Sequence, residues 1–260
     1  MGFIQGITEF LPVSSSTHLI LAEYLLNFKQ PEIFLNLFLH LATLCVVIIY
    51  FRSICMDLLK CPLDLFKKEI TPSVKLLILI IVATIPTALM GYFGQSYFDS
   101  LFEHLRFSGI TLIVNGLLLI LSTPLFKNPQ NTDDNLFHIG FSSKILLKAF
   151  MIGIFQGIAI IPGISRLGMT MISATYLGFS PLQSFNFSFL ISIPTIIGAF
   201  ILHMAPLTNT AFVPLTLAFI LCLIAGFISI SFLKSLITKG YFPFFGYYCI
   251  ILGIIVFSFL

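Results

Sequence analysis

We predict an all-α polytopic membrane protein with six transmembrane helices and two re-entrant helical hairpins, arranged as an inverted-topology repeat. Apolar residues make up 58% of the 260 residues and charged residues only 9%, proportions that exclude an ordinary soluble domain. Two of the apolar regions are broken by Pro, Gly and Ser, and both contain the sequence Gln-Gly-Ile. Lys and Arg are concentrated in particular loops, which indicates the direction of each span.

Six apolar stretches reach the length of about 20 residues that a helix needs to cross a bilayer. They are residues 33–51, 75–93, 108–126, 184–203, 212–233 and 243–260. Residues 1–26 and 145–178 are also apolar, but a Pro and a Ser/Gly cluster interrupt each of them. No basic stretch precedes the first apolar run, so we expect no cleavable signal peptide.

The basic residues predict the orientation of the spans. Most of the Lys and Arg that lie between spans fall in the three loops 52–75, 127–148 and 234–242. The positive-inside rule places these three loops in the cytoplasm and the poorly basic loops 94–107 and 204–211 outside. Residues 145–178 must then enter the membrane from the cytoplasm and return to it, whereas the N-terminal broken segment begins outside.

The two broken segments resemble each other. The sequences FIQGITEFLPVSSS and IFQGIAIIPGISR share Gln-Gly-Ile, then a Pro six or seven residues after the Gln, and then Ser. Because the segments enter from opposite faces, they predict an inverted-topology repeat. We expect a single integral membrane domain with halves at about 1–126 and 145–260, joined by a cytoplasmic loop at 127–144.

Each broken segment carries a charge close to its Pro, Glu9 in the first and Arg166 in the second. A charge within a membrane is costly, at roughly 2.5–3.5 kcal/mol on insertion scales, and usually functional. We expect the two breaks to meet, so that the arginine fork can pair with phosphate oxygens. Glu9 can act as a general base, orient a water or hold a divalent cation. The alternative is that Glu9 and Arg166 form a structural ion pair.

Hydroxyl residues follow the Pro of each broken segment. They are Ser14, Ser15 and Ser16 in the first segment and Ser165 in the second. Such residues cap a returning helix, whose N-terminal N–H groups attract anions. Two such helix ends at one depth predict a site for a phosphate or a diphosphate, and we expect Gly163 in the second break to belong to it.

Three further polar residues are candidates for this site. His18 lies one turn after Ser14 and can protonate a phosphate leaving group or activate a serine; the alternative is a histidine bonded to local carbonyls. Thr170 lies one turn after Arg166 and either adds a hydroxyl donor or only packs. His40 either lines the same cavity or forms a hydrogen bond between helices.

Other functions are disfavoured by composition. The net charge of +3 is too small and too dispersed for nucleic-acid binding. The five cysteines form neither a CxxC pair nor a metal-binding spacing. A secondary transporter or lipid flippase stays the alternative to an enzyme, because inverted repeats with broken helices are typical of transporters. The clustered acid, histidine and hydroxyl groups favour an enzyme.

At these residues the chain resembles the undecaprenyl-diphosphate phosphatase (bacitracin-resistance) family of bacterial integral membrane enzymes. The resemblance covers nearly all 260 residues and is carried by the motif from Gln5 to His18 and by Pro162-Gly163-Ile164-Ser165-Arg166. It implies hydrolysis of undecaprenyl diphosphate to undecaprenyl phosphate, which recycles the lipid carrier for cell-wall synthesis. It also implies a homodimer in the bacterial inner membrane and a divalent cation, Mg²⁺ or Ca²⁺. The external start of the first hairpin suggests a site open to the external leaflet.

The resemblance also implies roles for individual residues. Glu9 matches the family's essential acid, Ser15 its candidate nucleophile and His18 its catalytic histidine. The phosphate-binding residues that match are Ser165, Arg166 and Thr170. Three positions depart from the pattern. They are Gln5, where many members have a second carboxylate for the metal, Thr17, which replaces Gly, and Leu167, which replaces Ser and removes a hydroxyl donor.

Overall fold

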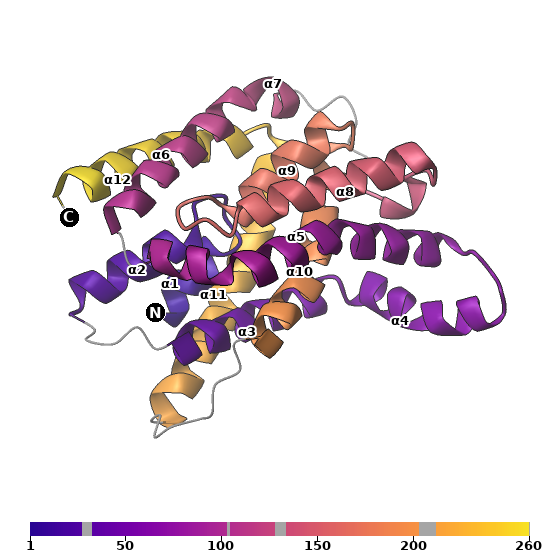
Figure 1. Ribbon diagram of the computed structural model, residues 1–260, viewed down its shortest axis with the longest axis horizontal. Helices are drawn as coiled ribbons and strands as arrows, with labels where there is room; N and C mark the ends of the chain where they lie inside the picture. The colour runs from indigo at the N-terminus through magenta and orange to yellow at the C-terminus, as the bar shows by residue number, and fades with distance from the viewer. Residues whose placement is uncertain (28–32, 103–104, 128–133, 203–211, 260) are drawn as a thin grey trace.

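The computed structural model describes residues 1–27, 33–102, 105–127, 134–202 and 212–259. All regular elements within these ranges are helical and none is a strand, so the predicted all-α class is confirmed (Figure 1). The helices are α1 (Gly2–Thr8), α2 (Ser15–Leu25), α3 (Ile33–Tyr50), α4 (Arg52–Phe66), α5 (Pro72–Phe102), α6 (Leu105–Leu121), α7 (Thr123–Phe126), η1 (Leu136–His138), α8 (Ser143–Ile158), α9 (Arg166–Tyr176), α10 (Pro181–Leu202), α11 (Phe212–Thr238), η2 (Phe242–Phe244) and α12 (Phe245–Phe259).

Apolar helices occupy all six predicted spans as far as the described residues reach. Three of them, within α5, α10 and α11, are long and apolar enough to cross a membrane, and α3 with α4 qualifies as a bent pair. The helices α6 and α12 are apolar but shorter. This is a multi-pass membrane protein, and the count of six spans stays a prediction. The predicted loop 204–211 and residues 128–133 lie outside the described residues.

The predicted polar loop 52–75 is wrong over its first part, which forms α4. This helix turns away from α3 by 87° at Phe51. Cys61 on α4 is fully buried and Leu58 packs against the core, whereas Lys60 is exposed. The segment is therefore an amphipathic helix, and its basic residues occupy the outer face.

Two predicted span ends also differ from the structure. The helix α5 continues to Phe102 instead of ending near residue 93. The predicted span 108–126 is split at Ser122 into α6 and α7. Pro124, in the first turn of α7, has no N–H to continue the ladder of α6.

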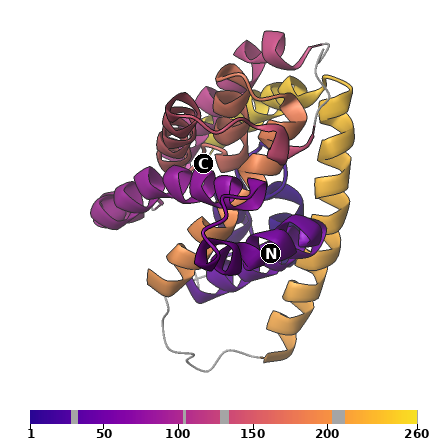
Figure 2. The same ribbon diagram turned by 90° about the vertical axis from the view of Figure 1, so that its right-hand side faces the viewer.

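Three helix pairs pack closely because glycines face the neighbouring backbone. The helix α1 lies along α11, α8 along α5, and α6 along α12; Figure 1 shows the last two pairs side by side, and Figure 2 shows α11 running along one side of the molecule. A Cβ atom added to Gly2 would lie 1.9 Å from the Ala218 carbonyl oxygen, and one on Gly153 would lie 2.0 Å from that of Ala83. Small residues at helix contacts allow this approach.

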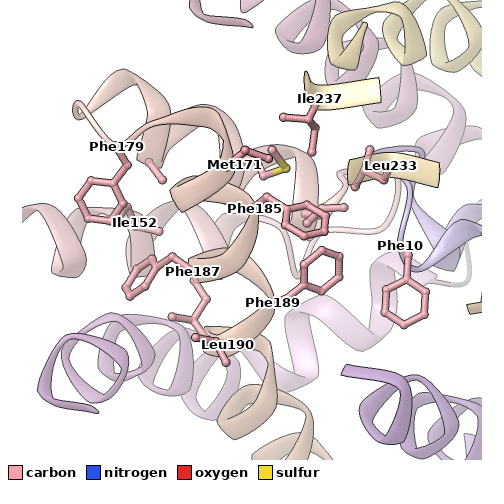
Figure 3. Close-up of a cluster of buried hydrophobic side chains, with 14 of the residues drawn as sticks. Phe10, Ile152, Met171, Phe179, Phe185, Phe187, Phe189, Leu190, Leu233 and Ile237 are labelled. Atoms are coloured by element: carbon pink, nitrogen blue, oxygen red, sulfur yellow. The ribbon is translucent and has the colours of Figure 1, made fainter. Parts of the chain in front are cut away.

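The N-terminal half of α10 forms the centre of the molecule. Residues 181–192 of this helix are all buried, and Phe185, Phe187 and Phe189 belong to the main apolar cluster (Figure 3). The ring of Phe10, in the break between α1 and α2, lies 5.6 Å from that of Phe189. The first break is therefore anchored on the central helix.

Candidate active site

Both predicted breaks are present. We call residues 9–14, between α1 and α2, the first elbow, and residues 159–165, between α8 and α9, the second elbow. Each elbow contains a residue with positive φ, Ser14 at 64° and Gly163 at 97°, a region that residues other than glycine rarely adopt. A Cβ atom on Gly163 would also lie only 1.9 Å from the Thr111 hydroxyl oxygen.

The helix caps after the two elbows differ. The Ser165 hydroxyl accepts a hydrogen bond from the Gly168 N–H at 3.1 Å, which is the predicted N-cap. Ser14 occupies the corresponding position before α2 but makes no such bond. Its hydroxyl instead lies 3.1 Å from that of Ser16 and 3.3 Å from that of Thr17.

The expected meeting of the two elbows is confirmed by the contacts of Glu9. Arg166 Nη2 donates a short hydrogen bond to Glu9 Oε1 and forms an ion pair with it. Glu9 Oε2 accepts from the Ser15 hydroxyl at 2.6 Å and from Gln5 Nε2 at 3.1 Å. The carboxylate thus joins a serine of its own segment to the arginine of the other.

A cavity of about 290 Å³ opens beside these groups. Its polar lining includes Glu9, Ser14, Ser15, Ser16, His40, Ser165 and Arg166. Much of its remaining lining is apolar, with Ile160, Ile164, Ile196 and Phe200 among the residues. A charged head group can therefore lie beside Arg166 while an attached hydrocarbon chain contacts apolar side chains.

The wall of the cavity also contains an uncharged cluster that the sequence did not predict. Gln156 Nε2 donates to the hydroxyls of Thr87 and Thr195, at 3.0 Å each. Those hydroxyls donate to the backbone carbonyls of Gly153 and Ile191. Gln156 Oε1 is left buried without a hydrogen-bond partner among the described residues, so this cluster offers only an acceptor. The sequence feature that indicates this cluster is Ile-Pro-Thr, which occurs at both 85–87 and 193–195 and contains the two threonines.

His18 lies outside the lining of the cavity. Its Nδ1 donates to the Ser14 carbonyl oxygen at 2.8 Å, and its Nε2 lies 2.7 Å from the Tyr248 hydroxyl oxygen. No contact with Ser15 or Glu9 is found among the described interactions of this histidine. The geometry matches the alternative of a histidine bonded to a local carbonyl.

Thr170 and Gly163 are also absent from the cavity lining. The Thr170 hydroxyl is fully buried and donates to the carbonyl oxygens of Arg166 and Leu167, at 2.9 and 3.2 Å. It supports the first turn of α9 from within the helix. The structure thus brings together Glu9, Ser15 and Arg166, with Ser14, Ser16, Ser165 and His40 also lining the cavity. Gln5 contacts Glu9 from outside the lining, whereas His18, Thr170 and Gly163 do not reach the cavity.

The protein oxygens that would hold a hard cation here are those of Glu9 and Gln5. Gln5 is fully buried, and its Oε1 has no partner among the described residues. Its Nε2 donates to Glu9 Oε2 and lies 3.2 Å from His40 Nδ1, which must accept because an amide nitrogen only donates. No group of three metal-binding side chains occurs in the described ranges, and Mg²⁺ often takes only one or two protein carboxylates, with phosphate and water oxygens completing its shell.

Two polar residues of α6 were missed by the sequence analysis. Asn115 Nδ2 donates to the Pro12 carbonyl oxygen at 3.0 Å, and Asn115 Oδ1 accepts from the Ser165 N–H at 2.9 Å. One turn earlier, the Thr111 hydroxyl donates to the Pro162 carbonyl oxygen. The sequence feature that indicates Asn115 is an amide side chain in the middle of the apolar run LIVNGLLLIL.

Comparison with known proteins agrees with these motifs. A family model described as Bacitracin resistance protein BacA matches residues 1–255. An undecaprenyl-diphosphatase of Methanococcus vannielii is 35% identical over 257 residues, which cover 98% of this chain and 96% of that protein. One of Halothermothrix orenii is 36% identical over 261 residues, with 98% and 94% covered. The undecaprenyl-diphosphatase 1 of Bacillus cereus is 32% identical over 268 residues, with 100% and 96% covered. With its two elbow motifs and these full-length relatives, the chain belongs to the bacitracin resistance protein BacA family.

Proposed function

We propose that this protein hydrolyses undecaprenyl diphosphate to undecaprenyl phosphate and inorganic phosphate, and so recycles the lipid carrier for peptidoglycan and other cell-wall polymers. The relatives are named for this activity. The observation that carries the proposal is the contact of one buried carboxylate, Glu9, with both the Ser15 hydroxyl and Arg166. A nucleophile, a base and an anion-binding group therefore share one cavity.

Ser15 is the nucleophile that the geometry supports best, because its hydroxyl already donates to Glu9 at 2.6 Å. The Ser15 oxygen attacks the terminal phosphorus, and its proton passes to Glu9. The bond from this phosphorus to the bridging oxygen breaks, and undecaprenyl phosphate leaves with the electron pair. A water then attacks the phosphorus of the phosphoserine. The bond from this phosphorus to the Ser15 oxygen breaks, and one proton of the water passes to the Ser15 oxygen, which restores the serine. Inorganic phosphate leaves, and Glu9 releases the proton that it took in the first step to solvent.

Positioning and charge stabilisation supply most of the catalysis of phosphoryl transfer. Arg166 neutralises the transferring group, aided by the hydroxyls of Ser14, Ser16 and Ser165 that line the cavity. A divalent cation, Mg²⁺ or Ca²⁺, would be held by Glu9 and Gln5 and would neutralise charge on the diphosphate. His18 holds the first elbow through the Ser14 carbonyl. The Thr170 hydroxyl stabilises the first turn of α9, which carries Arg166. Gly163 allows the positive φ angle within the second elbow.

The proposed architecture has six spans and two re-entrant hairpins in an inverted repeat, within one domain with halves at about 1–126 and 145–260. The helix contacts support it, because α1 packs on α11 as α8 packs on α5, while α6 packs on α12. This exchange of partners is what a two-fold relation between halves requires. We further propose a homodimer in the bacterial inner membrane, with the site open to the external leaflet.

The test is phosphate release from undecaprenyl diphosphate by detergent-solubilised protein, with Ser16→Ala as the matched control for Ser15→Ala. We expect Ser15→Ala to lose activity by at least about 10³-fold, and radiolabelled substrate to leave phosphoserine on the wild type after acid quenching. Ser16→Ala should raise KM by only a few-fold, because it removes one hydroxyl of the lining. Full activity of Ser15→Ala would assign the attack to a water held by Glu9. Lipid movement in vesicles without phosphate release would support a flippase instead, a function that the names of the relatives do not favour.

A further inference from the structure

A single buried amide lies between the two elbows. Asn115 is only 1% exposed. It donates to the carbonyl of Pro12, three residues before Ser15, and accepts from the N–H of Ser165, directly before Arg166. The side chain of Asn115 therefore connects the backbone of the first elbow to the backbone of the second elbow by hydrogen bonds. It is independent of the ion pair between Glu9 and Arg166.

The orientation of this amide is fixed by its partners. The Pro12 carbonyl can only accept a hydrogen bond, and the Ser165 N–H can only donate one. A carboxamide offers two N–H donors and an acceptor oxygen on the same planar group. Asn115 uses its Nδ2 for the Pro12 carbonyl and its Oδ1 for the Ser165 N–H, and Nδ2 also donates to Cys249 Sγ at 3.5 Å. A leucine of similar size offers neither, and an ionised aspartate offers only acceptors.

The helix that carries Asn115 is itself held in place. Gly116 of α6 and Gly246 of α12 face each other so closely that a Cβ atom on either would lie 2.6 or 2.5 Å from the carbonyl oxygen of the other. Thr111, one turn before Asn115, binds the Pro162 carbonyl of the second elbow. The helix α6 therefore provides a firm support from which Asn115 reaches both elbows.

We propose that Asn115 is a positioning residue that sets the register of the first elbow against the second. Its two hydrogen bonds hold the first elbow against the second, so that Glu9 contacts Ser15 and Arg166 at the same time. Asn115 does not line the cavity, so it acts through the elbows and does not touch the substrate. The inference rests on the proposed hydrolysis and adds a residue to its machinery.

The first experiment compares Asn115→Leu with Asn186→Leu as the matched control. Asn186 is also a buried amide, 6% exposed, and donates to a backbone carbonyl, that of Asp134, at 2.6 Å, but it contacts neither elbow. We expect Asn115→Leu to lower kcat/KM about 100-fold, since a misplacement of about 1 Å can cost this much. Asn186→Leu should stay within about threefold of the wild type.

A double-mutant cycle separates positioning from general destabilisation. In an Arg166→Lys background the guanidinium group that Asn115 aligns is already lost. Adding Asn115→Leu should then lower kcat/KM by less than about fivefold. A residue that only stabilises the fold would again cost about 100-fold, and that result would overturn the proposal.

The variant Asn115→Asp gives a test that survives poor folding of the leucine variant. A protonated aspartic acid can donate to Pro12 and accept from Ser165, whereas its ionised form cannot donate. The ratio of variant to wild-type activity should therefore rise at least about fivefold as the pH falls from 8 to 5.5. A flat ratio contradicts the inference. Absence of phosphate release by the wild type contradicts the proposed function instead, so the two failures are distinct.

Discussion

At the scale of single residues, Glu9 divides its two carboxylate oxygens between the two broken segments. One oxygen takes Arg166, and the other takes Ser15 and Gln5. A buried ion pair adds little net stability, yet removing one partner is costly because the other charge stays behind. The contacts that position Glu9 as the base therefore also make its substitution destabilising.

The variant Glu9→Gln should lower kcat/KM by about 10²–10⁴-fold, the usual contribution of a general base. Glu23→Gln is the matched control, because Glu23 lies in the same broken segment, accepts a hydrogen bond from Asn36 at 3.3 Å and does not line the cavity. Phosphate release is the measurement, and comparable losses in both variants would contradict the assignment.

The double variant Glu9→Gln/Arg166→Gln should melt at a higher temperature than Glu9→Gln, because no unpaired charge remains.

The sequence predicted the charges and the serines of the site and missed the amide that bridges its two halves. Glu9 and Arg166 stand out because a charge in an apolar run needs an explanation. Asn115 did not stand out, since an amide is cheaper to bury than a charge and the sequence does not show which backbone groups it will meet. Gln156 was noticed as part of the shared Gln-Gly-Ile sequence, but its contacts with Thr87 and Thr195 were not predicted. The contact of His18 with Tyr248 joins residues 230 positions apart, and no local pattern reports such a contact.

At the scale of helices, the contact between α8 and α5 depends on the missing side chain of Gly153. Its added Cβ atom would meet the backbone carbonyl of Ala83 at 2.0 Å, and a backbone atom cannot rotate away as a side chain does. The hydroxyl of Thr87 also donates to the Gly153 carbonyl at 2.8 Å. Separating the two helices would therefore move the second elbow as well.

The variant Gly153→Ala should lose about 1–3 kcal/mol of stability through overpacking and lose activity with it. Gly198→Ala, in the interior of α10, is the control, because nothing lies within 4 Å of the added Cβ atom. Alanine is the better helix former by about 1 kcal/mol, so the control should be neutral or stabilised. Thermal unfolding in detergent measures both, and a stabilised Gly153→Ala would contradict the close approach.

The helices were predicted well in their apolar centres and poorly at their ends. Hydropathy located an apolar helix in each of the six predicted stretches, because the bilayer sets the length of apolar sequence that a span needs. It assigned α4 to a loop because Arg52 and Lys60 mark the segment as polar, although its other face is apolar. The break at Ser122 depends on Pro124, a signal that a hydropathy window averages away.

At the scale of the whole molecule, the orientation in the membrane can be tested with single cysteines in a cysteine-free background. Lys67 and Arg106 are both exposed and lie at opposite ends of the polypeptide stretch that contains α5. In intact cells, a membrane-impermeant maleimide should label Arg106→Cys, whereas Lys67→Cys should require permeabilisation, because the positive-inside rule predicts that the basic loop is cytoplasmic. The reverse pattern would contradict the predicted orientation and the external opening of the site.

The size of the cavity predicts how the substrate tail affects turnover. An undecaprenyl tail is far too long for the apolar part of a cavity of about 290 Å³. Most of a prenyl chain must therefore stay among the lipids. In mixed micelles, kcat/KM should agree within about threefold for farnesyl, geranylgeranyl and undecaprenyl diphosphates at equal mole fraction. A tenfold gain with each added isoprene unit would contradict this.

The pairing of the elbows was predictable because two independent signals, loop charge and the shared Gln-Gly-Ile sequence, pointed to the same topology. The helix partners were not, since hydropathy does not report which glycines face a neighbouring backbone. The exchange of partners between α1 with α11 and α8 with α5 appears only in three dimensions.

The opposite charges of the elbows bear on how such a protein can evolve. Counted from the Gln of each Gln-Gly-Ile sequence, Glu9 corresponds to Ile160, and Arg166 corresponds to Ser15. Neither motif contains both charges, and each charge stands where the other motif has an uncharged residue. The ion pair between Glu9 and Arg166 therefore depends on positions at which the two motifs differ, and two identical motifs of either kind would lack it.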